Sequence, residues 1–266
     1  MKKDGCGEPG TTVSKCDIFD FMAKYVGLTV IHPGGFATTR QLIKALGVNR
    51  NSRVIDVACG KGTTAILLAE KLGCEVVGID LAPELIDEAI QLTKKKGLSG
   101  KVTFHVADAL DLPFSDGEFD IAVAQAMLVL MEDKVKAIQE AKRVIKPGGR
   151  AGWLELSWKK AIPPEFIRIL SDVICAYCMI NVQTFDGWRK IFDAAGVPEV
   201  GVIPLAFSPR RGGIFGMLKD EGFFRTISIL RNISNNPEIK ARMHAIRRSF
   251  KDYEDYFACG IYYFRK

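Results

Sequence analysis

The sequence has no hydrophobic run long enough to cross a membrane. Its longest apolar stretch, residues 121–131, is interrupted by Gln125, whereas a transmembrane helix needs about 18 or more consecutive apolar residues. No apolar stretch follows a basic N-terminus in the manner of a secretory signal. The 266 residues, 48% of them hydrophobic and 26% charged, therefore predict a globular protein of the cytoplasm with no membrane partner.

Histidine is scarce, and cysteine is irregularly placed. The chain has three histidines and seven cysteines, and an odd, unevenly spaced set of cysteines predicts a reducing compartment and no disulfide framework. Cys175 and Cys178 form a C-x-x-C pair, but no second pair lies near enough in the sequence to complete four zinc ligands. We therefore expect buried thiols at this pair, and no metal site.

The first 205 residues have no excess of either charge. Residues 206–266 hold 12 Lys and Arg against 6 Asp and Glu, so this segment carries the whole formal net charge of +6. The segment does not interleave aromatic and basic residues as nucleotide-stacking surfaces do. A solvated basic face is the favoured interpretation, and nucleic acid is not an expected partner.

Apolar strands alternate with helices through the middle of the chain. Helical patterns separate five short apolar runs, at residues 54–57, 75–80, 102–106, 119–124 and 150–156. This alternation predicts an α/β fold, a Rossmann-like three-layer sandwich whose parallel sheet is covered by helices on both faces.

The pattern changes after residue 158. Two further strands are expected at 200–207 and 259–264, and two helices, at 218–231 and 237–250, lie between them. We find no internal repeat and predict one domain over residues 1–266. Its expected parts are a helical cover at 1–50, a cofactor-binding core at 51–158, and an inserted helical lid at 159–184 and 208–256.

A glycine-rich turn follows the first predicted strand. Gly60 and Gly62 let the backbone approach a ligand closely, and the next helix offers its unpaired N–H groups. The pattern G-x-G-x-x-A matches the dinucleotide fingerprint. However, Asp56 lies at the strand end, where its carboxylate would repel a pyrophosphate. Asp56 therefore favours a ligand with a cationic amine, such as an amino-acid group, over a dinucleotide.

Polar side chains also follow the ends of the next strands. Asp80 lies 18 residues after Gly62 and can accept hydrogen bonds from two neighbouring ribose hydroxyls. Asp108 follows the third strand and can accept from a purine amine, while Gln125 follows the fourth. Parallel sheets bind ligands beyond the carboxyl ends of their strands, so we expect these side chains and Asp56 to share one site.

Five stretches resemble motifs of the class I S-adenosylmethionine-dependent methyltransferases. They are VIDVACGKG at 54–62, VGIDL at 77–81, ADALDLPF at 107–114, FDIAV at 119–123 and RVIKPGG at 143–149. The likeness covers about residues 53–155 and is closest to the small-molecule branch, type 11, that includes quinone and sterol methyltransferases. It implies S-adenosylmethionine as the cofactor, a small-molecule acceptor, and a seven-stranded sheet whose last strand is antiparallel.

The resemblance implies which residues hold the methionine part of the cofactor. Asp56, Gly60 and Gly62 would bind it, and Gln125 would lie beside it. Ala58 departs from the family, which usually has glycine there. We expect Ala58 to tighten the turn, with slightly altered affinity and retained binding.

The resemblance also implies which residues bind the adenosine part of the cofactor. Asp80 would bind the ribose hydroxyls, and Leu81 would cover one face of the adenine. Asp108 and Ala109 would meet the adenine edge.

The sequence does not single out a catalytic residue. The methyl group on a sulfonium is already electrophilic, so such an enzyme mainly aligns the acceptor, and only a poor nucleophile needs a general base. By resemblance the turn at 32–35 lies near the methionine end, which makes His32 a candidate base or carboxylate contact; a surface turn is the alternative. Glu155 is a second catalytic candidate, and Tyr25 and Tyr177 are candidates for binding the acceptor.

Three other functions stay open at this point. The Cys175 and Cys178 pair permits a soft-acceptor methyltransferase for arsenite or a thiol, although the scattered thiols support it poorly. The glycine pattern permits a nicotinamide-dependent oxidoreductase, although Asp56 counts against it. The basic C-terminal segment permits a non-catalytic cofactor-binding or RNA-associated module. The acceptor, its reacting atom and the oligomeric state also stay open.

Overall fold

One sheet organises the structure. The computed structural model describes residues 18–170, 173, 176–206 and 213–266, and an eight-stranded sheet runs through these ranges. The strand order is β3-β2-β1-β4-β5-β8-β7, and the short β6 pairs with β5. The strands are β1 Arg53–Val57, β2 Glu75–Asp80, β3 Val102–Val106, β4 Phe119–Gln125, β5 Ile145–Trp158, β6 Gln183–Thr184, β7 Gly201–Leu205 and β8 Phe257–Arg265.

The sheet is mostly parallel, as the sequence predicts. The first five strands pair in parallel, while β8 is antiparallel to both β5 and β7. The antiparallel last strand is therefore confirmed. The two-residue β6 adds an eighth strand, which is too short to leave a sequence pattern. The strand order reverses between β1 and β4, and such a switch point is where open α/β sheets bind ligands.

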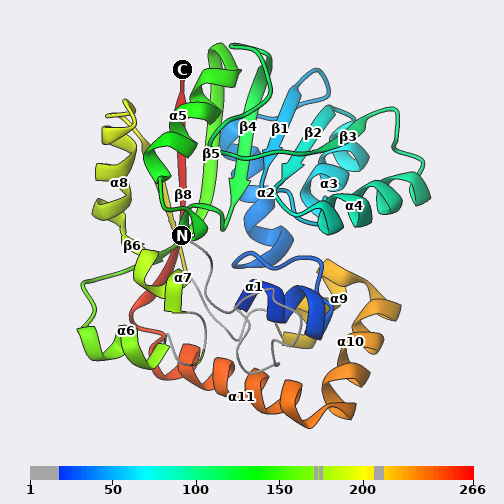
Figure 1. Cartoon of the computed structure of the whole chain (residues 1–266), viewed down its shortest axis with the longest axis vertical. Helices are drawn as coiled ribbons and strands as arrows, with labels where there is room; N and C mark the ends of the chain where they lie inside the picture. The colour runs from blue at the N-terminus through cyan, green and yellow to red at the C-terminus, as the bar shows by residue number, and fades with distance from the viewer. Residues whose placement is uncertain (1–17, 171–172, 174–175, 207–212) are drawn as a thin grey trace.

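Helices cover both faces of this sheet. In Figure 1, α2 lies behind the strands and α5 lies in front of them. Gly152 of β5 allows the close approach of α2, because a Cβ there would lie 2.9 Å from Leu42 and 3.0 Å from Leu46. The flanking helices are α2 Gly35–Leu46, α3 Thr63–Leu72, α4 Pro83–Lys95, α5 Lys134–Val144 and α8 Phe185–Ala194.

A second group of helices lies beyond the carboxyl ends of the parallel strands (Figure 1). It joins the N-terminal segment to the insertion before β8 through a small core in which Phe21, Val26, Ile229, Ile239 and Ile246 are buried. We call this group the lid. Its elements are α1 Ile18–Asp20, the π-helix Phe21–Val26, α6 Pro164–Leu170, α7 Ala176–Asn181, α9 Gly213–Glu221, α10 Phe223–Asn235 and α11 Pro237–Asp252.

Two sequence predictions concern membranes and thiols. Within the described ranges, no helix combines the length and the apolar character that a membrane span requires. Cys175 and the side chain of Cys178 lie outside the described residues, so the predicted buried pair stays a prediction.

Candidate active site

Asp56 lies near the end of β1 with its side chain buried, only 2% of the residue being exposed. Burial raises the pKa of its carboxyl group to about 7; the backbone of Ala65 lowers the pKa in part, and the charge of Asp80 raises it. Its Oδ2 atom has no hydrogen-bond partner. An unpaired buried carboxylate oxygen is unfavourable, so this position is suited to a ligand that brings a cationic donor.

The turn after β1 uses left-handed backbone at three positions. The φ angles are 58° at Ala58, 53° at Gly60 and 71° at Gly62. Ala58 therefore occupies a conformation that favours glycine, which gives a physical reason for the glycine usual in the resembled family. A Cβ at Gly62 would lie 2.5 Å from the Phe104 ring, while a Cβ at Gly60 would meet no atom within 4 Å. Gly62 thus serves packing, and Gly60 leaves space for a ligand.

Asp80, at the end of β2, binds the backbone of this glycine turn. Its Oδ2 accepts from the Gly60 N–H at 2.8 Å and its Oδ1 accepts from the Ala82 N–H at 3.0 Å. Each carboxylate oxygen can accept a further hydrogen bond. The next residue, Leu81, has 68% of its surface exposed. An apolar side chain next to the carboxylate is therefore accessible to a ligand.

The loop after β3 reaches the same edge of the sheet. The Ala107 N–H donates to the Asp80 carbonyl at 3.0 Å. Asp108 is exposed and its Oδ1 accepts from the Leu110 N–H at 2.9 Å, while Ala109 is buried. The structure therefore brings the ends of β1, β2 and β3 together.

A chain of polar side chains begins at Gln125, the last residue of β4. Gln125 donates from Nε2 to Thr64 Oγ1 at 2.8 Å, and its Oε1 accepts from Thr39 Oγ1 at 2.9 Å. Thr39 Oγ1 lies 3.1 Å from His32 Nε2. The chain connects the first turn of α3, next to the glycine turn, to His32. Thr39 and Thr64 were not predicted from the sequence, because Thr39 lies outside every motif and Thr64 occupies an unspecified position of the G-x-G-x-x-A pattern.

This chain favours one tautomer of His32. When the Thr39 hydroxyl donates to Gln125 Oε1, the nearer of its acceptors, it accepts from His32 Nε2, which places the imidazole hydrogen on that nitrogen. The other nitrogen, Nδ1, is then unprotonated, and it is buried without a hydrogen-bond partner. Burial lowers the pKa of His32 to about 4, with the Pro33 backbone opposing the shift. His32 is thus a neutral imidazole with one unused acceptor nitrogen.

Glu155 sits elsewhere, inside β5. Its residue is 0% exposed, and its Oε1 accepts from the Met127 and Leu128 N–H groups at 3.0 and 2.8 Å. It thereby holds the turn after β4, in which Leu128–Leu130 form a 3₁₀-helix. Burial raises the pKa of its carboxyl group to about 7. Glu155 does not line the cavity described next, and its catalytic role stays a prediction.

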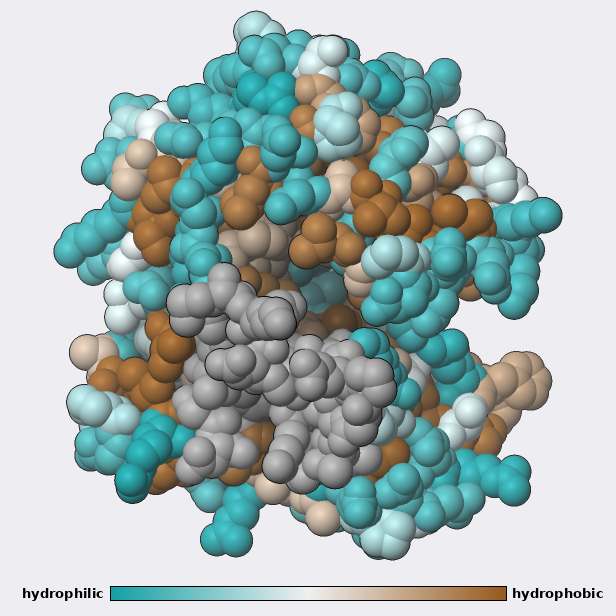
Figure 2. Space-filling view, in the orientation of Figure 1, coloured by the Kyte–Doolittle hydropathy of each residue, from teal (hydrophilic) through white to brown (hydrophobic). Residues whose placement is uncertain are grey.

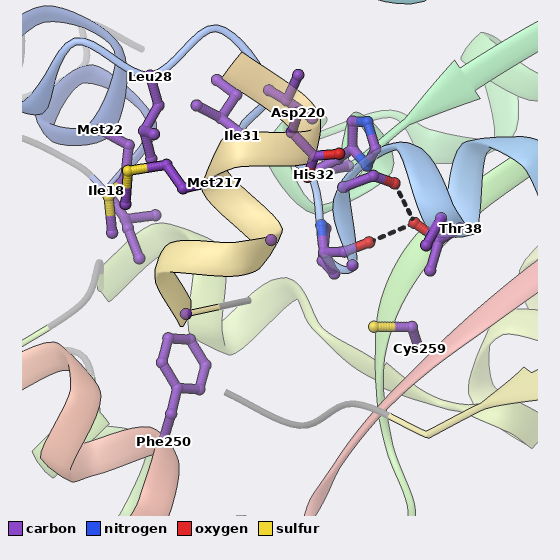
Figure 3. Close-up of a pocket in the computed structure, with 18 of the residues that line it drawn as sticks. Ile18, Met22, Leu28, Ile31, His32, Thr38, Met217, Asp220, Phe250 and Cys259 are labelled. Atoms are coloured by element: carbon purple, nitrogen blue, oxygen red, sulfur yellow. Dashed lines mark hydrogen bonds between the residues drawn. The ribbon is translucent and has the colours of Figure 1, made fainter. Parts of the chain in front are cut away.

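A cavity of about 1010 Å³ lies between the sheet edge and the lid. The surface is hollowed between these two parts of the molecule (Figure 2). His32 from the loop before α2, Met217 from α9 and Phe250 from α11 surround the cavity (Figure 3). Most of its lining is apolar, and both predicted lid insertions contribute to it, with Met179 and Val182 coming from the first.

Of the two tyrosine candidates, Tyr25 does not line this cavity. Tyr25 belongs to the π-helix and packs against the small core of the lid. The side chain of Tyr177, on α7, lies outside the described residues. Among the described side chains, no three His, Cys, Asp or Glu gather as metal ligands would.

Two acids at the end of α9 tie the lid to the loop that carries His32. Glu221 accepts from the Thr29 and Val30 N–H groups at 2.7 and 3.1 Å, and from the Thr29 hydroxyl at 2.7 Å. Asp220 accepts from the Phe36 N–H at 3.2 Å, at the start of α2. We call this pair of acids the latch. It was missed in the sequence because its partners lie more than 180 residues away and no motif marks them.

Comparison with known proteins supports the methyltransferase interpretation. A family model described as a methyltransferase domain matches residues 48–195. An uncharacterized protein of Haemophilus influenzae is 35% identical over 246 residues, which are 89% of this chain and 91% of that protein. The ubiquinone/menaquinone biosynthesis C-methyltransferase UbiE of a Geobacter species is 38% identical over 186 residues, 69% of this chain and 75% of that enzyme.

A solved structure shares the fold. The S-adenosylmethionine-dependent methyltransferase from Thiobacillus denitrificans, in complex with S-adenosyl-L-homocysteine, matches with a TM-score of 0.68 at 18% identity. The match covers 94% of this chain and 98% of that one. Together these findings favour a small-molecule methyltransferase over the soft-acceptor enzyme, the oxidoreductase and the non-catalytic module. The chain belongs to the methyltransferase-domain family, within the class I S-adenosylmethionine-dependent methyltransferases.

Proposed function

We propose that this protein transfers the methyl group of S-adenosylmethionine to a small molecule bound in the cavity. The observation that carries the proposal is the buried, unpartnered Oδ2 of Asp56, together with the open space at Gly60 in the turn that follows its strand. The ammonium of an amino-acid group would pair with this oxygen, whereas the pyrophosphate of a dinucleotide would be repelled by it.

The other residues proposed to contact the cofactor lie at the same edge of the sheet. Asp80 retains acceptor capacity for ribose hydroxyls, and the exposed Leu81 offers an apolar surface to one face of the adenine. Asp108 and Ala109 lie at the next strand end, where the adenine edge would be bound. Gln125 would lie beside the methionine moiety. These assignments rest on the positions of the side chains and on the family's motifs.

In the proposed reaction the cofactor supplies the reactive methyl group, and the protein positions the acceptor. S-Adenosylmethionine, when bound, supplies a methyl group whose bond to a positively charged sulfur breaks as the acceptor atom bonds to the carbon. The chain's own contribution is to hold the acceptor in line and to exclude water. His32 Nδ1 would accept a hydrogen bond from the acceptor, which orients its reacting atom.

Isothermal titration calorimetry with S-adenosylmethionine, S-adenosylhomocysteine and NAD tests the proposal. We expect the two sulfur ligands to bind and NAD not to bind. Asp80→Ala should weaken binding of S-adenosylhomocysteine by about 2–4 kcal/mol, because two charge-assisted hydrogen bonds are lost together.

The matched control is Asp87→Ala, which removes an exposed carboxylate from α4. Asp80→Asn keeps the shape of the side chain that holds the glycine turn. An Asp80→Ala protein that folds and binds with unchanged affinity, or wild-type protein that prefers NAD, would contradict the assignment.

A further inference from the structure

The cavity has two chemically different ends. At the sheet side, His32 lines the cavity from the loop before α2, and its Nδ1 is buried without a hydrogen-bond partner. At another side lies α11, which crosses the lid beyond the strand ends in Figure 1 and packs on the start of β8 through Phe250 and Phe257. A ligand that reached both sides would therefore carry a reacting group at one end and another recognised group at the other.

The α11 wall is cationic as well as apolar. Lys240, His244 and Arg247 all line the cavity, and their spacing places them on one face of the helix. Met243 and Phe250 line the cavity from the same helix. The wall thus offers an apolar surface bordered by the basic side chains of Lys240 and Arg247.

Lys240 and Arg247 have no ion-pair partner among the described residues, whereas Arg248, one position after Arg247, pairs with Asp252 at 3.5 Å. Among the described residues, the acids that line the cavity are the latch residues, and two other lining cations, Arg40 and Lys219, interact with Asp220. Glu221 is occupied by backbone N–H groups and by Arg225 at 2.9 Å, and Asp220 accepts from the Phe36 N–H.

The size of the cavity fits a long acceptor. Ligand pockets usually measure roughly 300–1,000 Å³, so about 1010 Å³ accommodates an apolar body much larger than an amino acid. Exposed cationic side chains at the rim of an apolar pocket favour a ligand with one anionic end, because charge-assisted hydrogen bonds form there without burying an unpaired charge.

We propose that the methyl acceptor is an amphipathic anion, with an apolar body in the cavity and a carboxylate or phosphate held by Lys240 and Arg247. Its reacting end lies beside His32, away from the anionic end. The inference rests on the proposed function, since it names the substrate class of the same site.

Binding of three probes with one chain length tests this class: decyl phosphate, decanoate and decanol, each kept below micelle formation. We expect the two anions to bind wild-type protein about ten-fold more tightly than decanol. Comparison of the phosphate with the carboxylate identifies the preferred anionic group. Lys240→Gln/Arg247→Gln should abolish this preference and leave the affinity for decanol unchanged.

The matched control is Arg248→Gln/Lys251→Gln, which removes the same charge from residues of α11 that do not line the cavity. It should keep the preference for anions. S-Adenosylhomocysteine is titrated in parallel. If it binds while decanol and the anions bind equally, or the two double variants behave alike, the acceptor class is wrong. If S-adenosylhomocysteine itself fails to bind wild-type protein, the proposed function fails instead.

Discussion

At the scale of single residues, the site contrasts two kinds of buried polar group. Asp56 is an acid whose burial raises its pKa to about 7, and His32 is a base whose burial lowers its pKa to about 4. Each has one polar atom without a partner. Both groups therefore favour their neutral forms in the free protein, and each offers an unused acceptor to a ligand.

The hydrogen-bond chain predicts which tautomer His32 adopts. We expect nitrogen NMR at about pH 6 to find a neutral ring with its hydrogen on Nε2, because burial lowers the pKa and Thr39 accepts from that nitrogen. Thr39→Val should remove the tautomer preference. Thr103→Val, at an exposed position of β3, should keep it. A wild-type ring that is charged, or protonated on Nδ1 alone, would refute the hydrogen-bond chain.

At the scale of elements, the latch determines where the His32 loop lies. Glu221 accepts three hydrogen bonds from Thr29 and Val30, and its own side chain is only 1% exposed. Charged acceptors make stronger hydrogen bonds than neutral ones. The position of His32 thus depends on a helix nearly two hundred residues later in the chain.

Removing that acid should loosen the loop. We expect Glu221→Ala to lower the local stability of residues 27–36 by about 2 kcal/mol, roughly 30-fold in amide exchange rate, because two partly buried N–H groups lose their charged acceptor. Hydrogen exchange measured by mass spectrometry reports it. Glu199→Ala, which alters an exposed loop residue before β7, is the control. Equal exchange at 27–36 in both variants would show that the latch does not hold the loop.

The strands could be predicted from the sequence, and the lid only in part. Strands such as 54–57 and 75–80 are short β-branched runs buried on both faces, and that environment imposes a recognisable composition. The expected helix at 218–231 is instead divided into α9 and α10 at Gly222, where φ is 79°. A single glycine within a helical pattern does not reveal whether the chain turns there, because packing against the N-terminal segment decides it.

Part of the candidate site could also be predicted from the sequence, and part could not. Asp56, Asp80, Asp108 and Gln125 could be placed together because parallel topology brings strand ends to one edge. The contacts of His32 could not be foreseen, since Thr39 and Gln125 are 86 residues apart. Long-range pairs of this kind depend on how α2 docks on the sheet, which local sequence does not encode.

At the scale of the whole molecule, ligand binding and proton binding are linked. Below about pH 7 Asp56 is mostly protonated in the free protein, because its folded pKa is raised. Pairing with an ammonium requires the ionised carboxylate, so cofactor binding must release a proton there. Cofactor affinity should accordingly fall as the pH drops through about 7, by up to about ten-fold per pH unit.

The number of protons released on ligand binding tests directly whether Asp56 receives the cofactor's ammonium. S-Adenosylhomocysteine is titrated calorimetrically at about pH 6 in buffers of different ionisation enthalpy, alongside 5′-methylthioadenosine, which lacks the amino-acid group. We predict release of about one proton for S-adenosylhomocysteine and about none for 5′-methylthioadenosine. Asp56→Asn should abolish the release and weaken S-adenosylhomocysteine by about 2–5 kcal/mol. Equal proton counts for the two ligands, or an Asp56→Asn protein that binds as wild type, would contradict the claim that Asp56 receives the cofactor's ammonium.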